Sequence, residues 1–330
     1  MSNIFSRRAF ALGSACLAGA TTSQAMGREV GIVTAPSSLG LRPNEKGEEP
    51  GSWRAPGVLL SAGLATAISA RHRVDIARRD YDFKEQSGTR IRNGNSLRPF
   101  LLEVADAVEA EMSAGRFALV VGGDCSVMLG GLLALRRTGG RGLVHVDGHS
   151  DFFHPGNYDT KARLGSAAGM DLALATGRGE ALLTKWPDLE GPLVADEDAV
   201  QVGERDAEDP DYDKFYGDVV RTQITRLTIQ QILREGMRRT TGRILGRLEQ
   251  RSIRRAWVHV DLDVLDEKVM NAVDSPGKPG FDFAQLSELL GFLVSTGRVA
   301  GMTVCIYDPN LDPDHRFAKP IVECLASALR

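Results

Sequence analysis

Three short apolar runs constrain the fold of this 330-residue chain more than any other feature of its sequence. They cover residues 117–121, 142–146 and 256–260, and a glycine or an aspartate follows each of them directly. The runs are nearly continuous in apolar character, which is typical of strands buried on both faces of a sheet. A sheet that is covered on both faces indicates an α/β protein with helices packed on either side.

The rest of the chain repeats a short β-branched run, a turn and then a helical pattern. We expect further strands at residues 29–34, 73–77, 199–203 and 301–306. Apolar residues recur at helical spacing in residues 58–70, 97–115, 228–234, 243–249, 283–295 and 319–329. This alternation predicts a mostly parallel sheet, in which ligands gather at the carboxyl ends of the strands.

The composition is that of a globular protein and argues against one class of partner. Hydrophobic residues make up 42% of the chain and charged residues 25%, so a substantial core can form. The formal net charge is -3, and no basic block interleaved with aromatic residues occurs. Nucleic acid is therefore not an expected partner.

The first 25 residues form a pattern of their own. A twin-arginine sequence at Arg7 and Arg8 is followed by a weakly apolar stretch, residues 10–20, and by a small-x-small cleavage site ending at Ala25. An amphipathic helix or a membrane anchor is the alternative, but the stretch is shorter than the ~20 residues that span a bilayer. We expect a signal peptide at 1–25, twin-arginine export to the periplasm or outside the cell, and a mature domain at 26–330 without a membrane span.

Three cysteines remain after such a cleavage: Cys125, Cys305 and Cys324. An odd number leaves at least one thiol unpaired in an oxidising compartment, and binding to a metal would protect it. A disulfide between Cys305 and Cys324 is one arrangement. Two buried free thiols are the favoured one.

Two acidic clusters follow matching apolar runs. Asp147, His149 and Asp151 alternate directly after residues 142–146, and Asp261 and Asp263 repeat that spacing after residues 256–260. If the strand geometry continues, alternate side chains share one face and converge on one pocket. Turn-forming or helix-capping aspartates are the alternative, because they also commonly follow strands. The matching positions favour metal binding, since carboxylates are ligands of hard cations.

A third segment, residues 122–126, follows the run at 117–121 with the sequence Gly-Gly-Asp-Cys-Ser. Two glycines permit a tight turn, which Asp124 could stabilise, and Cys125 could then point towards the metals. A lone cysteine at such a place is more often a small core residue.

These three segments resemble the motifs of the ureohydrolases, the family of arginase, agmatinase and formiminoglutamase. That family has Gly-Gly-Asp-His-Ser, then Asp-Ala-His-x-Asp, then Ser-x-Asp-x-Asp with a downstream Pro-Gly stretch. The corresponding segments here are residues 122–126, 147–151, 259–263 and 275–280, and residues 202–206 resemble a further strand end. The resemblance implies one three-layer α/β/α domain with an eight-stranded, mostly parallel sheet and two manganese ions.

The resemblance also assigns a role to each candidate ligand. Asp147 and Asp261 would bridge the two ions and so act in catalysis. The remaining ligands would be Cys125 and Asp151 on one ion, and His149 and Asp263 on the other. A pair of cations lowers the pKa of a shared water and supplies hydroxide at neutral pH. The implied reaction is hydrolytic cleavage of a C–N bond.

The chain departs from the family pattern at three positions. Cys125 replaces a histidine ligand, and its softer thiolate would move the site towards zinc or mixed occupancy, while the four carboxylates still favour a hard ion such as manganese. Leu164 replaces a histidine that shuttles protons in arginases. His154 is its nearest substitute, although a loop histidine without that role is the favoured interpretation. Ile306 replaces a glutamate that binds guanidinium, so a cationic substrate would lose its main countercharge.

The sequence thus predicts a binuclear metal hydrolase of linear C–N bonds rather than an ordinary arginase. A different amidine, a hydroxyguanidine or a linear amide would be the small-molecule substrate. The glycine- and proline-rich segment 37–57 and residues 165–174 are the expected places of substrate contact. A non-catalytic metal-binding protein on the same fold is the alternative. A homo-oligomer is expected from the resemblance alone.

Overall fold

The computed structural model describes residues 28–330 except 188, 209–211 and 213–216. The expected signal peptide at 1–25 lies outside the described residues. No helix within the described ranges is both long and apolar enough to cross a membrane.

Eight strands in the described part of the chain form one sheet, and every neighbouring pair is parallel. The order across the sheet is β2-β1-β3-β8-β7-β4-β5-β6. The expected parallel α/β sheet is confirmed. The strands are β1 Val30–Ala35, β2 His72–Asp75, β3 Phe117–Gly122, β4 Gly142–Val146, β5 Ala199–Val202, β6 Thr225–Leu227, β7 Ala256–Asp261 and β8 Val299–Cys305.

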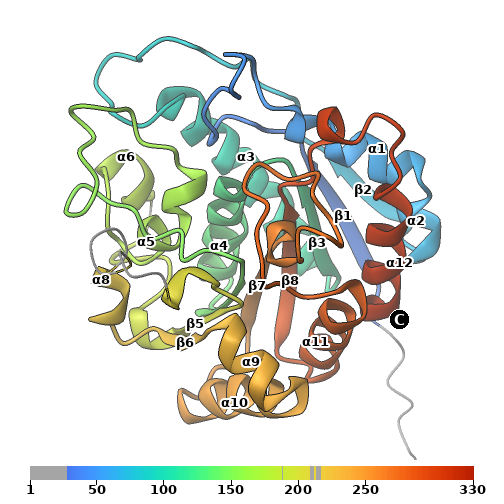
Figure 1. Ribbon diagram of the computed structural model, residues 1–330. Helices are drawn as coiled ribbons and strands as arrows, with labels where there is room; N and C mark the ends of the chain where they lie inside the picture. Colours follow the sequence, from blue (N-terminus) through green and yellow to red (C-terminus); the bar gives the residue numbers. More distant parts are fainter. Residues whose placement is uncertain (1–27, 188, 209–211, 213–216) are drawn as a thin grey trace, which may run out of the picture.

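Helices cover both faces of the sheet, so the fold is a three-layer α/β/α arrangement. Figure 1 shows α3 and α4 on one side and α11 and α12 on the other. The helices are α1 Ala55–Ser61, α2 Leu64–Ala67, α3 Gly94–Ser113, α4 Met128–Arg137, α5 Asp171–Ala175, α6 Ala181–Thr184, α8 Gly217–Val220, α9 Ile229–Glu235, α10 Met237–Gln250, α11 Phe283–Ser295 and α12 Ala318–Leu329.

The core fills the space on both faces of the sheet, between the strands and helices α3, α4, α11 and α12. All residues of β3, β4, β7 and β8 are buried, as their apolar sequences predict. Trp257 packs near Met128, Leu132 and Met302, and its indole N–H donates to Thr303 Oγ1 at 2.8 Å. A Cβ at Gly131 of α4 would lie 2.4 Å from the indole ring, so this close helix-to-strand approach requires glycine.

Several local features differ from the sequence prediction, among them the short helices α5, α6 and α8, which were not predicted. The helix expected at 58–70 is divided into α1 and α2 by Gly63, whose φ of 93° is left-handed. The short edge strand β6 was not predicted, because three residues are too few to show the apolar pattern of a strand. Helix α4 was not predicted either. All residues from Met128 to Leu135 are buried, so no polar face reveals the helical period.

Candidate metal centre

The two acidic clusters lie side by side because β4 and β7 are neighbours in the sheet. The two strands pair in register, with His145 opposite His259. Asp147 and Asp261 follow two residues later, at the carboxyl ends of the strands. Cys125 enters from the short 3₁₀ helix η2, Cys125–Val127, directly after β3. The sheet order therefore brings three segments together that are far apart in the sequence.

All six predicted ligand residues converge into two adjacent groups. The ligand atoms of one group lie within 4.8 Å of one another, and so do those of the other group. Cys125 Sγ lies 2.7 Å from Asp261 Oδ2, and His149 Nδ1 lies 2.8 Å from Asp263 Oδ2. The groups are Cys125, Asp151 and Asp261, and Asp147, His149 and Asp263.

The convergence does not come from continued strand geometry, so that part of the sequence argument is wrong. β4 ends at Val146, and Asp151 adopts a left-handed φ of 44°. Backbone hydrogen bonds within the turn orient the carboxylates instead. The His149 N–H donates to Asp147 Oδ1 at 2.6 Å, and the Asp263 N–H donates to Asp261 Oδ1 at 2.6 Å.

The Gly-Gly-Asp turn positions Cys125 as expected. A Cβ at Gly123 would lie 1.7 Å from the carbonyl oxygen of Ser37, so only glycine fits there. The buried Asp124 carboxylate accepts hydrogen bonds from the Ser37 hydroxyl at 2.7 Å and from the Gly40 N–H at 3.2 Å. Asp124 thereby joins the turn to the start of the 37–57 segment.

Residues 202–206 support the centre from the other side. The Arg205 N–H donates to the Gly148 carbonyl at 2.8 Å, and its guanidinium donates to the Asp263 carbonyl. The Gly148 N–H in turn donates to Asp263 Oδ1 at 3.1 Å. This segment therefore braces both acidic clusters at once.

The crowding of carboxylates perturbs their protonation. Burial, followed by the charge of Asp263, raises the pKa of Asp147 to about 8. The same causes raise the pKa of Asp261 well above its ordinary value, and burial followed by Asp147 does so for Asp151. Burial lowers the pKa of His149, but Asp263 and Asp147 outweigh it and raise the value to about 10. Ionised together, these carboxylates require cations beside them.

The donor set fits a pair of divalent metal ions. Asp147 Oδ2 is buried and has no hydrogen-bond partner among the described residues. Four carboxylates and one imidazole suit manganese, whereas the Cys125 thiolate is a softer donor.

Metal removal is expected to make stability strongly dependent on pH. The folded pKa of Asp147 lies above its ordinary value, so the metal-free folded state retains a proton that the unfolded chain releases. His149 acts in the same direction. The metal-free protein should therefore lose stability as pH rises from about 5 to about 9, whereas stabilisation by manganese should increase. Thermal melts with chelator or with manganese across this range measure both trends; a melting temperature of the metal-free protein that rises with pH would contradict this.

The ligand groups open into a pocket of about 1140 Å³. Cys125, His149, Asp151, Asp261 and Asp263 all line it. The two segments expected to contact substrate contribute to its walls. They provide Leu41, Arg42, Pro43, Asn44, Glu45, Lys46, Glu48, Pro50 and Arg54 from one segment and Ser166, Ala168, Gly169 and Met170 from the other.

The three departures from the family pattern lie in different surroundings. Ile306 lines the pocket and has a φ of 74°, which is unusual for a β-branched residue. Its N–H donates to the Gly123 carbonyl at 2.7 Å. Leu164 does not line the pocket. His154 does not line it either, and its Nε2 lies 3.1 Å from Asp218 Oδ2, so its position gives a proton-shuttle role no support.

Sequence reasoning missed several polar residues of the pocket. Asp274 lines it, and desolvation followed by the charge of Asp263 raises the pKa of Asp274 to about 7. Tyr158 was also missed, and its hydroxyl accepts a hydrogen bond at 3.0 Å from Arg42 of the expected 37–57 segment. His315 also lines the pocket. Asp274 adjoins the Pro-Gly stretch, which was the one signal that could have indicated it.

The fold and the centre define an α/β protein whose parallel strands present two adjacent groups of potential metal ligands at one pocket. The model of the arginase family matches residues 28–329, and the chain belongs to that family, the ureohydrolases. The resemblance drawn from the motifs is confirmed.

Individual relatives agree with the family model. The chain is 27% identical over 246 residues to an arginase of Bacillus caldovelox, covering 74% of this chain and 78% of that protein. It is 26% identical over 307 residues to human arginase-1, covering 87% of each. The solved structure of the Bacillus caldovelox arginase has a TM-score of 0.79 at 24% identity, covering 92% of this chain and 98% of that chain. Proclavaminate amidino hydrolase from Streptomyces clavuligerus has a TM-score of 0.65 at 20% identity, covering 92% and 91%.

Proposed function

We propose that this protein is a metal-dependent hydrolase of linear C–N bonds in small guanidino, hydroxyguanidino, amidino or amide compounds. The observation that carries the proposal is the convergence of six ligand residues into two groups at one pocket. Membership of the arginase family supports the same reaction class.

The residues present would hold two Mn²⁺ ions, with Zn²⁺ or mixed occupancy favoured by Cys125. Such a pair supplies a water deprotonated near neutral pH and stabilises negative charge that develops on the substrate. Asp147 would hold one ion together with His149 and Asp263, and Asp261 would hold the other together with Cys125 and Asp151. That these two aspartates would be shared between the ions is what the family resemblance implies. Asp263 keeps His149 oriented through the 2.8 Å contact.

The pocket walls would bind and orient the substrate. Ile306 offers an apolar surface where the family has a carboxylate, so a strongly cationic guanidinium is not the favoured substrate. Arg42 and Tyr158 offer polar groups further along the wall. These features favour a less basic C–N compound over arginine.

The proposal is tested by incubating metal-loaded protein with a panel of guanidino, hydroxyguanidino, amidino and amide compounds. Release of urea, amine or ammonia supports it. A protein that carries its metals and hydrolyses none of these compounds would instead support a non-catalytic metal-binding role, for which Ile306 is the favouring observation.

Restoring a carboxylate at position 306 should restore guanidinium recognition. Ile306→Glu should lower KM for a guanidino compound by about 10- to 100-fold, because a charge-assisted hydrogen bond contributes about 1.5–3 kcal/mol. Ile306→Gln is the matched control, since it adds a polar side chain without charge. Steady-state kinetics of both variants check the result. Equal KM values for the two variants would count against this interpretation of position 306.

Two further proposals concern the whole chain. We propose that residues 1–25 direct twin-arginine export and are removed, leaving a periplasmic or secreted protein. Mass spectrometry of the exported protein, with a mature terminus at residue 26, tests this. We also propose a homo-oligomer, by analogy with the family, and its mass in solution is the measurement.

A further inference from the structure

A second layer of polar residues lies beneath the proposed metal pair. Side chains on a strand alternate between faces, so His259 shares a face of β7 with Asp261. On the neighbouring strand, His145 Nε2 lies 3.6 Å from Asp147 Oδ2. His145 and His259 pair in register, and their ring centroids are 5.0 Å apart. The two histidines thus lie beneath the candidate ligands of the proposed metal pair, deeper in the core of the protein.

Asp171, the first residue of α5, meets both imidazoles. His145 Nε2 lies 3.0 Å from Asp171 Oδ1, and His259 Nε2 lies 3.5 Å from Asp171 Oδ2. All three side chains are 0% exposed. None of them lines the pocket, so they stand apart from substrate contact.

Several polar atoms of this layer lack hydrogen-bond partners within the described residues. They are buried, and burial without a partner is costly because water no longer compensates the polar group. The atoms are His145 Nδ1, His259 Nδ1, His259 Nε2 and Asp171 Oδ2. Two of them, His259 Nε2 and Asp171 Oδ2, lie 3.5 Å apart, and an unpaired nitrogen and oxygen at that separation indicate a cation-binding position.

Two further groups of potential ligand atoms meet here, and both contain His259. One joins His259 to Cys125 and Asp171, and the other joins it to His145 and Asp147, with all atoms of a group within 4.8 Å of one another. The first group combines sulfur, nitrogen and oxygen donors. Zinc binds sulfur, nitrogen and oxygen donors of these kinds, whereas the two ligand groups above are rich in oxygen.

The balance of charge also favours a cation in the layer formed by His145, Asp171 and His259. Two divalent ions at the pair would balance the four carboxylates of Asp147, Asp151, Asp261 and Asp263. Asp171 is a further buried carboxylate, whose Oδ1 contacts His145 Nε2 at 3.0 Å and whose Oδ2 has no hydrogen-bond partner among the described residues. A further cation beside it would balance its charge and that of a shared Cys125 thiolate.

We propose that Cys125, Asp171 and His259 form a third metal position for a zinc-class ion beneath the pair. Asp171 and His259 are fully buried and do not line the pocket, so the role that we infer for this position is structural: it would hold η2, α5 and β7 together beneath the ligand groups. A shared Cys125 thiolate would couple this position to the pair. The inference does not depend on the proposed hydrolysis.

The deciding experiment uses the full chain, loaded with zinc and crystallised. Anomalous scattering at the zinc edge should place a peak within coordination distance of Cys125 Sγ, Asp171 and His259, separate from peaks at the pair. Zinc confined to the pair, with His145, Asp171 and His259 joined only by hydrogen bonds or water, would overturn the proposal. Because this measurement uses the unaltered protein, it stands even if variants fail to fold.

Metal counts in variants provide the second measurement. Asp171→Asn and His259→Asn should each lose one zinc per chain and keep the ions of the pair. Thr303→Val is the matched control, because Thr303 is buried, pairs with His259 in the sheet register and belongs to neither group. Unchanged zinc content in Asp171→Asn and His259→Asn would overturn the third position, while product release measured on the same proteins reports separately on the hydrolase proposal.

Discussion

Asp261→Asn is expected to remove metal binding and hydrolysis together. Asp261 Oδ2 contacts the Cys125 thiol in one ligand group, and Asp261 Oδ1 accepts a hydrogen bond from the backbone N–H of Asp263, which belongs to the second group. An amide cannot supply the negative charge that either ion requires. Activity should fall on the order of 10³-fold or more, because a metal-bound water has a pKa of about 7 and bulk water about 15.7.

Elemental analysis and product release, measured on the same preparation, check this prediction. Asp274→Asn is the matched control for metal content, since Asp274 lines the same pocket but belongs to neither ligand group. It should retain both ions of the pair. An Asp261→Asn protein with a full metal complement and undiminished turnover would contradict the assignment of Asp261.

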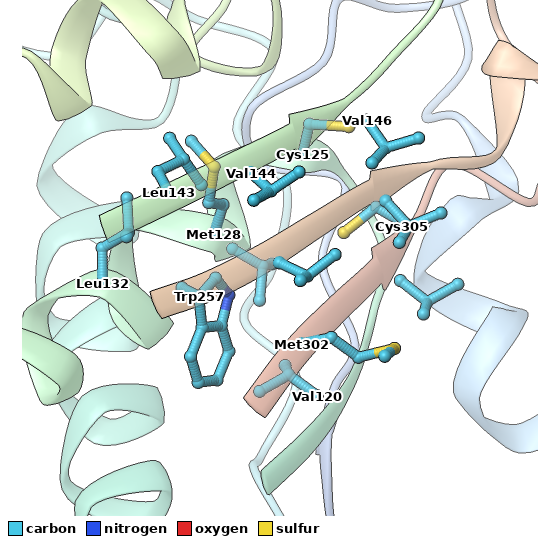
Figure 2. Packing of buried hydrophobic residues seen from close by; sticks show 14 of the residues in the cluster. Val120, Cys125, Met128, Leu132, Leu143, Val144, Val146, Trp257, Met302 and Cys305 are labelled. Carbon is cyan, nitrogen blue, oxygen red and sulfur yellow. The ribbon is translucent and has the colours of Figure 1, made fainter. Parts of the chain in front are cut away.

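The second large effect concerns metal selectivity. Cys125→His should shift the preference from zinc towards manganese by about 10-fold or more, because an imidazole is a harder donor than a thiolate. Cys125 is fully buried, and Cys125 and Cys305 lie at the same end of the packed core (Figure 2). The substitution therefore acts on the centre rather than on the surface.

Competition between zinc and manganese, followed by metal analysis, measures the shift. Cobalt substitution adds a spectroscopic signature, since thiolate-to-cobalt charge transfer should disappear in Cys125→His. Cys324→Ala is the control, because Cys324 is also buried and free but lies on α12. If the variant and the control select metals equally, Cys125 is not a ligand.

The strands were largely predictable because burial on both faces leaves a local signal. The run at 142–146 coincides with β4, and the helix expected at 283–295 coincides with α11. Free thiols at Cys305 and Cys324, the favoured arrangement, are confirmed. β6 and α4 were missed because one is too short and the other too uniformly buried to show a period.

The six candidate ligands were predictable because metal ligands follow strand ends in short motifs. Asp274 and the layer formed by His145, Asp171 and His259 were not. Asp171 lies in α5 and belongs to no motif, and His145 and His259 resemble ordinary strand residues until their strands are placed side by side. Their role depends on neighbours that are distant in the sequence.

The sequence by itself determined the parallel α/β class, the family and the identity of six candidate ligands, because periodicity, turn chemistry and motifs are local properties. Only the tertiary structure decided that β4 and β7 are neighbours, and that a turn at Asp151 rather than a continued strand brings the candidate ligands together. It also decided that Ile306 lines the pocket and that His154 instead pairs with Asp218. Those outcomes depend on sheet order and on loop packing, which long-range contacts set and no local pattern records.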